Sequence, residues 1–268
     1  MEWAAVQRGK SRVWLGALLG LAIPLSAGAQ GFSRTEVQYQ GGSAWVEGDL
    51  SPPGFQHVLT FQHASAWSHG ANFFFVDLAC CDDPVSNRDA YLEWYSNLSL
   101  GALSGNEIAF GPVKDVMLTG GLNWGAQARL AKFTPGIRFS LDLPGFAFAN
   151  LDFNYLVDFS GGLASGGAPK TDGIWNVDFN WARPLQIGEG SFSIEGHGEW
   201  QSPTGTETGE DRPYQVLLQP QIRYDIGKAM WGADNRLLMG TELQVWINKF
   251  GVDGANEFLP QLLVVFGF

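Results

Sequence analysis

The chain has little basic charge and, beyond its N-terminus, no long apolar segment. It contains 16 lysines and arginines against 27 aspartates and glutamates, and its formal net charge is −11 at pH 7. A nucleic-acid-binding protein needs a basic stripe, so this balance argues against a nucleic-acid partner. After residue 29 no segment approaches the roughly 18 consecutive apolar residues of a spanning helix, so the sequence predicts no transmembrane helix.

Cysteines are nearly absent as well. The only two are the adjacent Cys80 and Cys81. In an exported protein they either form a vicinal disulfide that stiffens a loop or pair with nothing, and the sequence leaves both readings open. A metal site needs further ligands at suitable spacing, and none lies nearby. The sequence therefore predicts no metal and no other cofactor.

The N-terminus carries the features of an export signal. Arg8, Lys10 and Arg12 form a basic region, an apolar run covers residues 13–25, and Ala27-Gly28-Ala29 is a small-residue cleavage site. An anchor helix that is never cleaved is the alternative, but the apolar run, at about 13 residues, is too short to span a bilayer. We expect residues 1–29 to be a signal peptide, residues 30–54 a lead-in or first strand, and residues 55–268 one domain.

The exported part is rich in aromatic residues and glycine. The chain has 11 tryptophans, 19 phenylalanines and 35 glycines, and only 16 % of its residues are charged. A typical soluble domain is nearer a quarter charged. This composition is typical of a membrane β-barrel.

Polar and apolar residues alternate with period two in segment after segment, which indicates strands. Residues 91–100, 150–158, 192–200, 218–225 and 242–248 are examples. A soluble β-sandwich alternates in the same way. Here, however, the polar face carries charges, and the apolar face ends in aromatics such as Trp175 and Trp200, as at a membrane interface.

Turn signals divide residues 58–268 into eleven strand-like segments. A closed bacterial barrel has an even number of strands, so we expect about twelve, with the missing strand in residues 32–50 or in a merged run. The acidic residues 202–212 read as an outward loop and residues 188–190 as a periplasmic turn. The final apolar segment ends on Phe268, an aromatic C-terminus that resembles the signal read by the outer-membrane insertion machinery.

Three blocks resemble the nucleoside-specific channel (Tsx) family of outer-membrane proteins. They are residues 89–94 (DAYLEW), residues 219–229 (QPQIRYDIGKA) and residues 240–251 (GTELQVWINKFG), followed by Pro260-Gln261 and an apolar run to a terminal aromatic. The resemblance covers residues 55–268 and is strongest over the last 55. It implies a monomeric twelve-stranded barrel with a narrow pore for passive diffusion of nucleosides. The acidic loop and the adjacent cysteines depart from the family pattern.

The polar parity defines the expected pore lining. It contains Glu93, Arg138, Asp152, Asp178, Glu195, Glu199, Arg223, Asp225 and Glu242, together with Tyr91, Tyr95 and Trp246. Such charges can simply pair across the lumen. For a ligand site, aromatic faces stack on a base, and carboxylates accept from hydroxyl groups. The residues we predict to line the site are Tyr91, Glu93, Arg223, Glu242, Trp246 and Asn248.

Two other functions stay open. The first is a closed structural or receptor barrel without transport. The second is an outer-membrane lipid-modifying enzyme, for which His63 and Ser65 on one strand face are the best candidates, although no Gly-x-Ser-x-Gly motif is present. We expect a non-enzymatic channel in the Gram-negative outer membrane, surrounded by lipid.

Overall fold

The computed structural model describes residues 30–48, 54–80 and 88–268, without the side chains of Gln30, Cys80 and Arg88. The predicted signal peptide and the fate of the two cysteines lie outside the described residues. No helix in the described part of the chain is long and apolar enough to cross a membrane.

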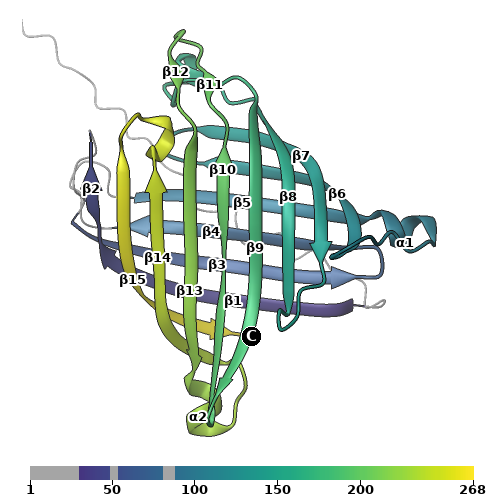
Figure 1. Cartoon of the computed structure of the whole chain (residues 1–268). Helices are drawn as coiled ribbons and strands as arrows, with labels where there is room; N and C mark the ends of the chain where they lie inside the picture. Colours follow the sequence, from purple (N-terminus) through teal and green to yellow (C-terminus); the bar gives the residue numbers. More distant parts are fainter. Residues whose placement is uncertain (1–29, 49–53, 81–87) are drawn as a thin grey trace, which may run out of the picture.

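Twelve long strands form one closed antiparallel barrel (Figure 1). They are β1 (Gln30–Ser43), β3 (Phe55–Trp67), β4 (Gly70–Cys80), β5 (Arg88–Ser99), β6 (Val113–Gly125), β7 (Leu130–Leu141), β8 (Phe148–Asp158), β9 (Ile174–Ile187), β10 (Gly190–Gln201), β13 (Gln215–Asp225), β14 (Leu237–Ile247) and β15 (Asn256–Gly267). Each strand pairs with the next, and β15 closes the ring by pairing with β1, Glu36 opposite Gly267. The predicted barrel is confirmed, and β1 supplies the twelfth strand in the stretch that the sequence left ambiguous.

Short elements occupy the two ends of the barrel. The end where β1 begins and β15 ends has α1 (Leu100–Ser104), between β5 and β6, and α2 (Ile226–Trp231), between β13 and β14. The opposite end has β2 (Trp45–Glu47), η1 (Gly162–Ser165), β11 (Thr204–Gly205), β12 (Asp211–Arg212) and η2 (Lys249–Gly251). Bacterial barrels have short periplasmic turns and longer extracellular loops. We therefore call the first end the periplasmic end and the second the outer end.

Two outer loops are joined to each other. Thr171 in the β8–β9 loop pairs with Thr206 in the β10–β13 loop. The Glu207 carboxylate accepts hydrogen bonds from the backbone N–H groups of Leu163 (2.6 Å) and Lys170 (3.0 Å). These backbone donors hold the pKa of Glu207 below its usual value. The acidic segment therefore belongs to an ordered outer cap.

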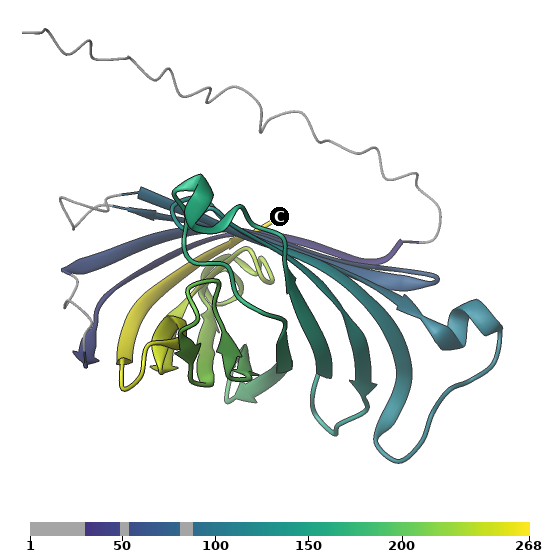
Figure 2. The ribbon, with the colours of Figure 1, turned by 90° about the horizontal axis from the view of Figure 1, so that it is seen from above.

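The two walls of the barrel run in different directions. In Figure 1, β9, β10 and β13 to β15 stand upright in front, and β1, β3, β4 and β5 cross behind them, so the barrel looks flattened from above (Figure 2). Flattening brings lumen-facing side chains of different strands close together.

Side chains alternate between lipid and lumen, as the period of a strand requires. Outward-facing Trp175 is 61 % exposed and Phe153 is exposed, whereas their neighbours Asn176 and Asp152 are buried. Leu238, Leu263 and Val265 form an apolar cluster on the inner face of β14 and β15. Polar residues inside and aromatics outside invert the pattern of a soluble sandwich, so the burial pattern agrees with the barrel.

Candidate functional site

On the wall formed by β5 and β6, Glu93 accepts hydrogen bonds from three neighbours. The donors are the Tyr91 hydroxyl (2.5 Å), the Tyr95 hydroxyl (3.0 Å) and the Asn123 amide (2.7 Å). Tyr91, Glu93 and Tyr95 share one face of β5, and Asn123 lies opposite Glu93 in the ladder. The register therefore builds this carboxyl site from the alternation that the sequence displays.

A second cluster spans four strands. The Arg223 guanidinium on β13 donates to Glu36 on β1 at 3.1 and 3.2 Å and to Gln221 at 2.7 Å, and it lies 3.3 Å from Glu195. Gln221 in turn donates a short hydrogen bond to Glu242. Gly240 stands opposite Arg223 on β14 and places no side chain in the path toward β1. Arg223 and Glu242 are thus joined through Gln221.

The basic residues inside the barrel are largely paired with acids. Arg138 binds Asp152 through two hydrogen bonds of 2.7 and 2.6 Å. His197 lies 2.9 Å from Asp178 and 2.7 Å from Gln219. Lys249, near the outer end, lies 2.7 Å from both Glu257 oxygens. Such pairs are what we expect if these lumen charges have a structural role.

Four lumen carboxyl groups that interact with His197 have no ion pair in the described part of the chain. Glu93, Glu199, Asp77 and Glu242 are held instead by hydroxyl or amide donors. They come from β5, β10, β4 and β14, and each interacts electrostatically with His197. One histidine therefore lies among four acids that have no basic partner of their own, and the lumen has an acidic excess.

Aromatic rings line the same wall as Glu93. Phe73 and Phe75 on β4 have ring centroids 6.1 Å apart, and Phe75 is 6.1 Å from Tyr91. Tyr95 lies opposite Phe73 in the ladder. Sequence reasoning missed the two phenylalanines because residues 73–75 are all Phe, so that segment shows no alternation. Both phenylalanines are an even number of residues from Asp77, a lumen residue, and this spacing would have assigned them to the lumen face.

The six predicted site residues fall into three places. Tyr91 and Glu93 form one group, and Arg223 and Glu242 another. Trp246 faces the lumen near the outer end, with the Lys249 ammonium 5.9 Å from its ring. Asn248 lies just beyond β14, where it donates to the Tyr214 carbonyl and accepts from the Gly254 N–H, both at 3.0 Å. Its amide holds the β14–β15 turn together. The structure adds two residues to the group of Arg223 and Glu242, namely Glu36 and Gln221, which both accept hydrogen bonds from Arg223.

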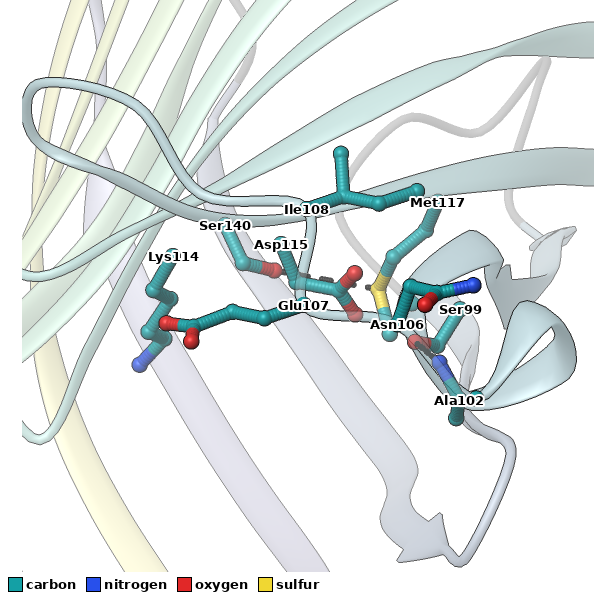
Figure 3. Close-up of a pocket in the computed structure, with 11 residues that line it drawn as sticks. Ser99, Ala102, Asn106, Glu107, Ile108, Lys114, Asp115, Met117 and Ser140 are labelled. Atoms are coloured by element: carbon teal, nitrogen blue, oxygen red, sulfur yellow. Dashed lines mark hydrogen bonds between the residues drawn. The ribbon is translucent and has the colours of Figure 1, made fainter.

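A cavity of about 590 Å³ opens at the periplasmic end, beside the β5–β6 turn (Figure 3). Ser99, Met117 and Ser140 line it and lie on the lumen face of their strands. Asn106, Glu107 and Asp115 add polar groups. The cavity therefore forms part of the lumen opening at that end.

The histidine proposed for lipid chemistry, His63, has another partner. On the lipid face His63 lies 2.9 Å from the Thr35 hydroxyl, and His57 lies 2.7 Å from the Tyr39 hydroxyl. Among the described residues no hydrogen bond joins His63 to Ser65 or to an acid. The structure therefore does not assemble a nucleophile, a base and an acid around Ser65.

No protein-family model and no curated protein sequence matches the chain. Solved structures are similar to it in shape. The NanC porin aligns with a TM-score of 0.52 at 11 % identity, over 86 % of this chain and 98 % of that one. A KdgM porin in complex with disordered oligogalacturonate aligns with a TM-score of 0.45 at 11 % identity, over 87 % and 99 %.

At such low identity these similarities concern the fold alone, and membership of the nucleoside-channel family stays a prediction. The closed ring of twelve strands, its aromatic outer face and its polar interior agree with the fold of the NanC porin. The chain is a porin-like β-barrel of the Gram-negative outer membrane.

Proposed function

We propose that the protein is a monomeric channel for passive diffusion of small polar solutes, with nucleosides as the first candidates. The observation that carries the proposal is the inner wall of β4 and β5, where aromatic rings adjoin a carboxyl group that has no basic partner. The acidic excess of the lumen disfavours anions by electrostatic repulsion. Neutral and cationic solutes are therefore preferred.

A nucleoside suits this wall in both of its parts. The flat base can stack on Phe75 and Tyr91, and stacking on an aromatic ring contributes about 1–3 kcal/mol per base. The ribose hydroxyls can donate to Glu93, and further along the lumen to Glu199 or Glu242. Several weak sites in series are what conduction requires, since a solute must leave as well as bind. The resemblance of residues 89–94 to the nucleoside-channel family supports the same choice.

Outer-membrane lipid surrounds the barrel in this proposal. The insertion machinery recognises β15, whose outer face carries Phe258, Leu262 and Phe266 and which Phe268 follows.

The test is single-channel current of the refolded barrel in a planar bilayer, with thymidine titrated in. Phe75→Leu should raise the thymidine concentration for half-block about tenfold, because one stacking contact is lost. Phe74→Leu is the matched control. Phe74 is adjacent on β4 but faces lipid, against Phe61 and His63. It should leave the half-block concentration unchanged.

Equal block of both variants would remove the aromatic wall from the solute path. Current without any nucleoside effect would keep the channel and discard the nucleoside.

A second candidate is a closed barrel, favoured by the Arg223–Glu36 pair, whose side chains are only 3 % and 2 % exposed. A barrel that carries no current in either variant would support this candidate.

A further inference from the structure

The outer half of the lumen contains a row of amide oxygens that have no hydrogen-bond donor. Asn154 on β8 and Asn176 on β9 lie opposite each other in the ladder, and they are 4 % and 6 % exposed. The Oδ1 atom of each is buried and has no partner. Gln201 on β10 lies opposite both Asn176 and Gln215 in the ladder, so Gln215 on β13 is at the same height in the barrel. Its Oε1 atom also has no hydrogen-bond partner among the described residues. A buried acceptor without a donor costs about 1–3 kcal/mol, so three in one row call for a functional explanation.

The orientation of these amides follows from Glu199 on β10. Its carboxylate accepts from the Asn176 amide at 2.8 Å and from the Gln201 amide at 3.3 Å. Gln201 then accepts from the Gln215 amide at 2.5 Å. An ionised carboxylate can only accept, so the NH₂ groups of Asn176 and Gln201 must point toward it. The carbonyl oxygens of Asn176 and Gln215 are consequently left over.

Most of the charges near the row are paired. In the adjacent lumen layer Asp152 is paired with Arg138 and Asp178 with His197. Glu199 has no ion pair in the described part of the chain. Lys132 on β7 interacts electrostatically with Glu199, with Asp158 and with a second cation, Arg212. Glu199 is therefore the charged group of the row that has no close counter-ion among the described residues.

We propose that Asn154, Asn176 and Glu199 form a binding site for the ammonium group of a small organic amine. An ammonium has three donors and no acceptor, which complements two amide oxygens beside a carboxylate that lacks a basic partner. A sugar or nucleoside hydroxyl is uncharged and donates one hydrogen bond, so it complements two acceptors and a carboxylate less well. This inference rests on the proposed channel, since the amine reaches the row through the lumen, and it adds amines to the substrate class.

The test uses putrescine as the probe and 1,4-butanediol as its uncharged counterpart of the same length. Calorimetric titration of the refolded barrel in detergent should detect putrescine binding and no butanediol binding. Asn154→Leu removes one acceptor from the row and should weaken putrescine binding about tenfold, as expected for losing one hydrogen bond to a charged group. Glu199→Gln should weaken it at least as much.

Asn154→Leu is also safe for folding. Its oxygen makes no hydrogen bond, so an apolar replacement should leave the urea midpoint of the barrel unchanged or raise it. Asn150→Leu is the matched control on the same face of β8. The Asn150 oxygen already accepts from Ser140 at 3.1 Å, so folded Asn150→Leu should bind putrescine like the natural chain.

Undiminished putrescine binding by Asn154→Leu, or equal binding of butanediol, would overturn the site. The calorimetric result does not depend on current. A barrel that binds putrescine but conducts nothing would therefore refute the proposed channel and keep the amine site.

Discussion

The ion pair between Arg223 and Glu36 allows a quantitative prediction. The two residues are 187 positions apart in sequence, yet their side chains meet inside the barrel at 3.1 Å. Both are almost fully buried, and Arg34 adds a second, short contact to Glu36. Arg223→Met would fill a similar volume while leaving Glu36 and Glu195 without their shared cation. Removing one partner of a buried pair costs about 3–5 kcal/mol, because the remaining charge is desolvated and uncompensated.

We place the expected loss near the lower limit, at about 3 kcal/mol, since Arg34 still contacts Glu36. The assay is urea unfolding of the refolded barrel in lipid vesicles, followed by tryptophan fluorescence. Glu36→Gln combined with Arg223→Met removes both charges, and it should recover at least about 1 kcal/mol relative to Arg223→Met alone, as expected for coupled residues in contact.

Arg223→Lys is the control variant that keeps the positive charge but removes the planar guanidinium group. It should recover part of the loss, because an ammonium retains the charge but cannot reproduce the geometry of the guanidinium contacts to Glu36 and Gln221. A change below about 1 kcal/mol for Arg223→Met, or strictly additive effects in the double variant, would refute the reasoning, because such values are typical of exposed pairs.

Two more predictions concern the ladder and the outer cap. A Cβ atom on Gly240 would lie 1.8 Å from the Ile222 carbonyl oxygen, so Gly240→Ala should lower the urea stability by about 1–3 kcal/mol, whereas Gly120→Ala, with nothing within 4 Å, should not. Equal stabilities would show that β13 and β14 adjust without cost. Because the pKa of Glu207 is lowered, its contacts to Leu163 and Lys170 exist above the usual carboxyl pKa and are lost as the pH falls through the lowered value. Protection of those two amides from hydrogen exchange, measured relative to the intrinsic rate at each pH, should therefore fall at low pH in the natural chain and not in Glu207→Gln, and pH-independent protection in both would contradict the assignment.

Where a strand alternates in sequence, the alternation was sufficient to assign its inner and outer faces. Glu93, Arg138, Asp152 and Arg223 were assigned to the lumen from sequence, and all four lie there. This works because side chains of a strand alternate strictly and because lipid excludes polar groups from the outer face. Where a segment has no alternation the method fails, as it did for Phe73 and Phe75. It also assigned Asn248 to the pore lining, although the strand ends one residue earlier.

The contacts between distant strands were decided by tertiary structure alone. Nothing in the sequence pairs Arg223 with Glu36, sets Asp77, Glu93, Glu199 and Glu242 around His197, or aligns Asn154 with Asn176 and Gln215. Those relations depend on the register of twelve strands and on the flattening of the closed barrel. The sequence by itself determined which residues face inward, because that follows from local geometry. Which inward residues meet depends on how the ring closes, and ring closure is a property of all the strands together.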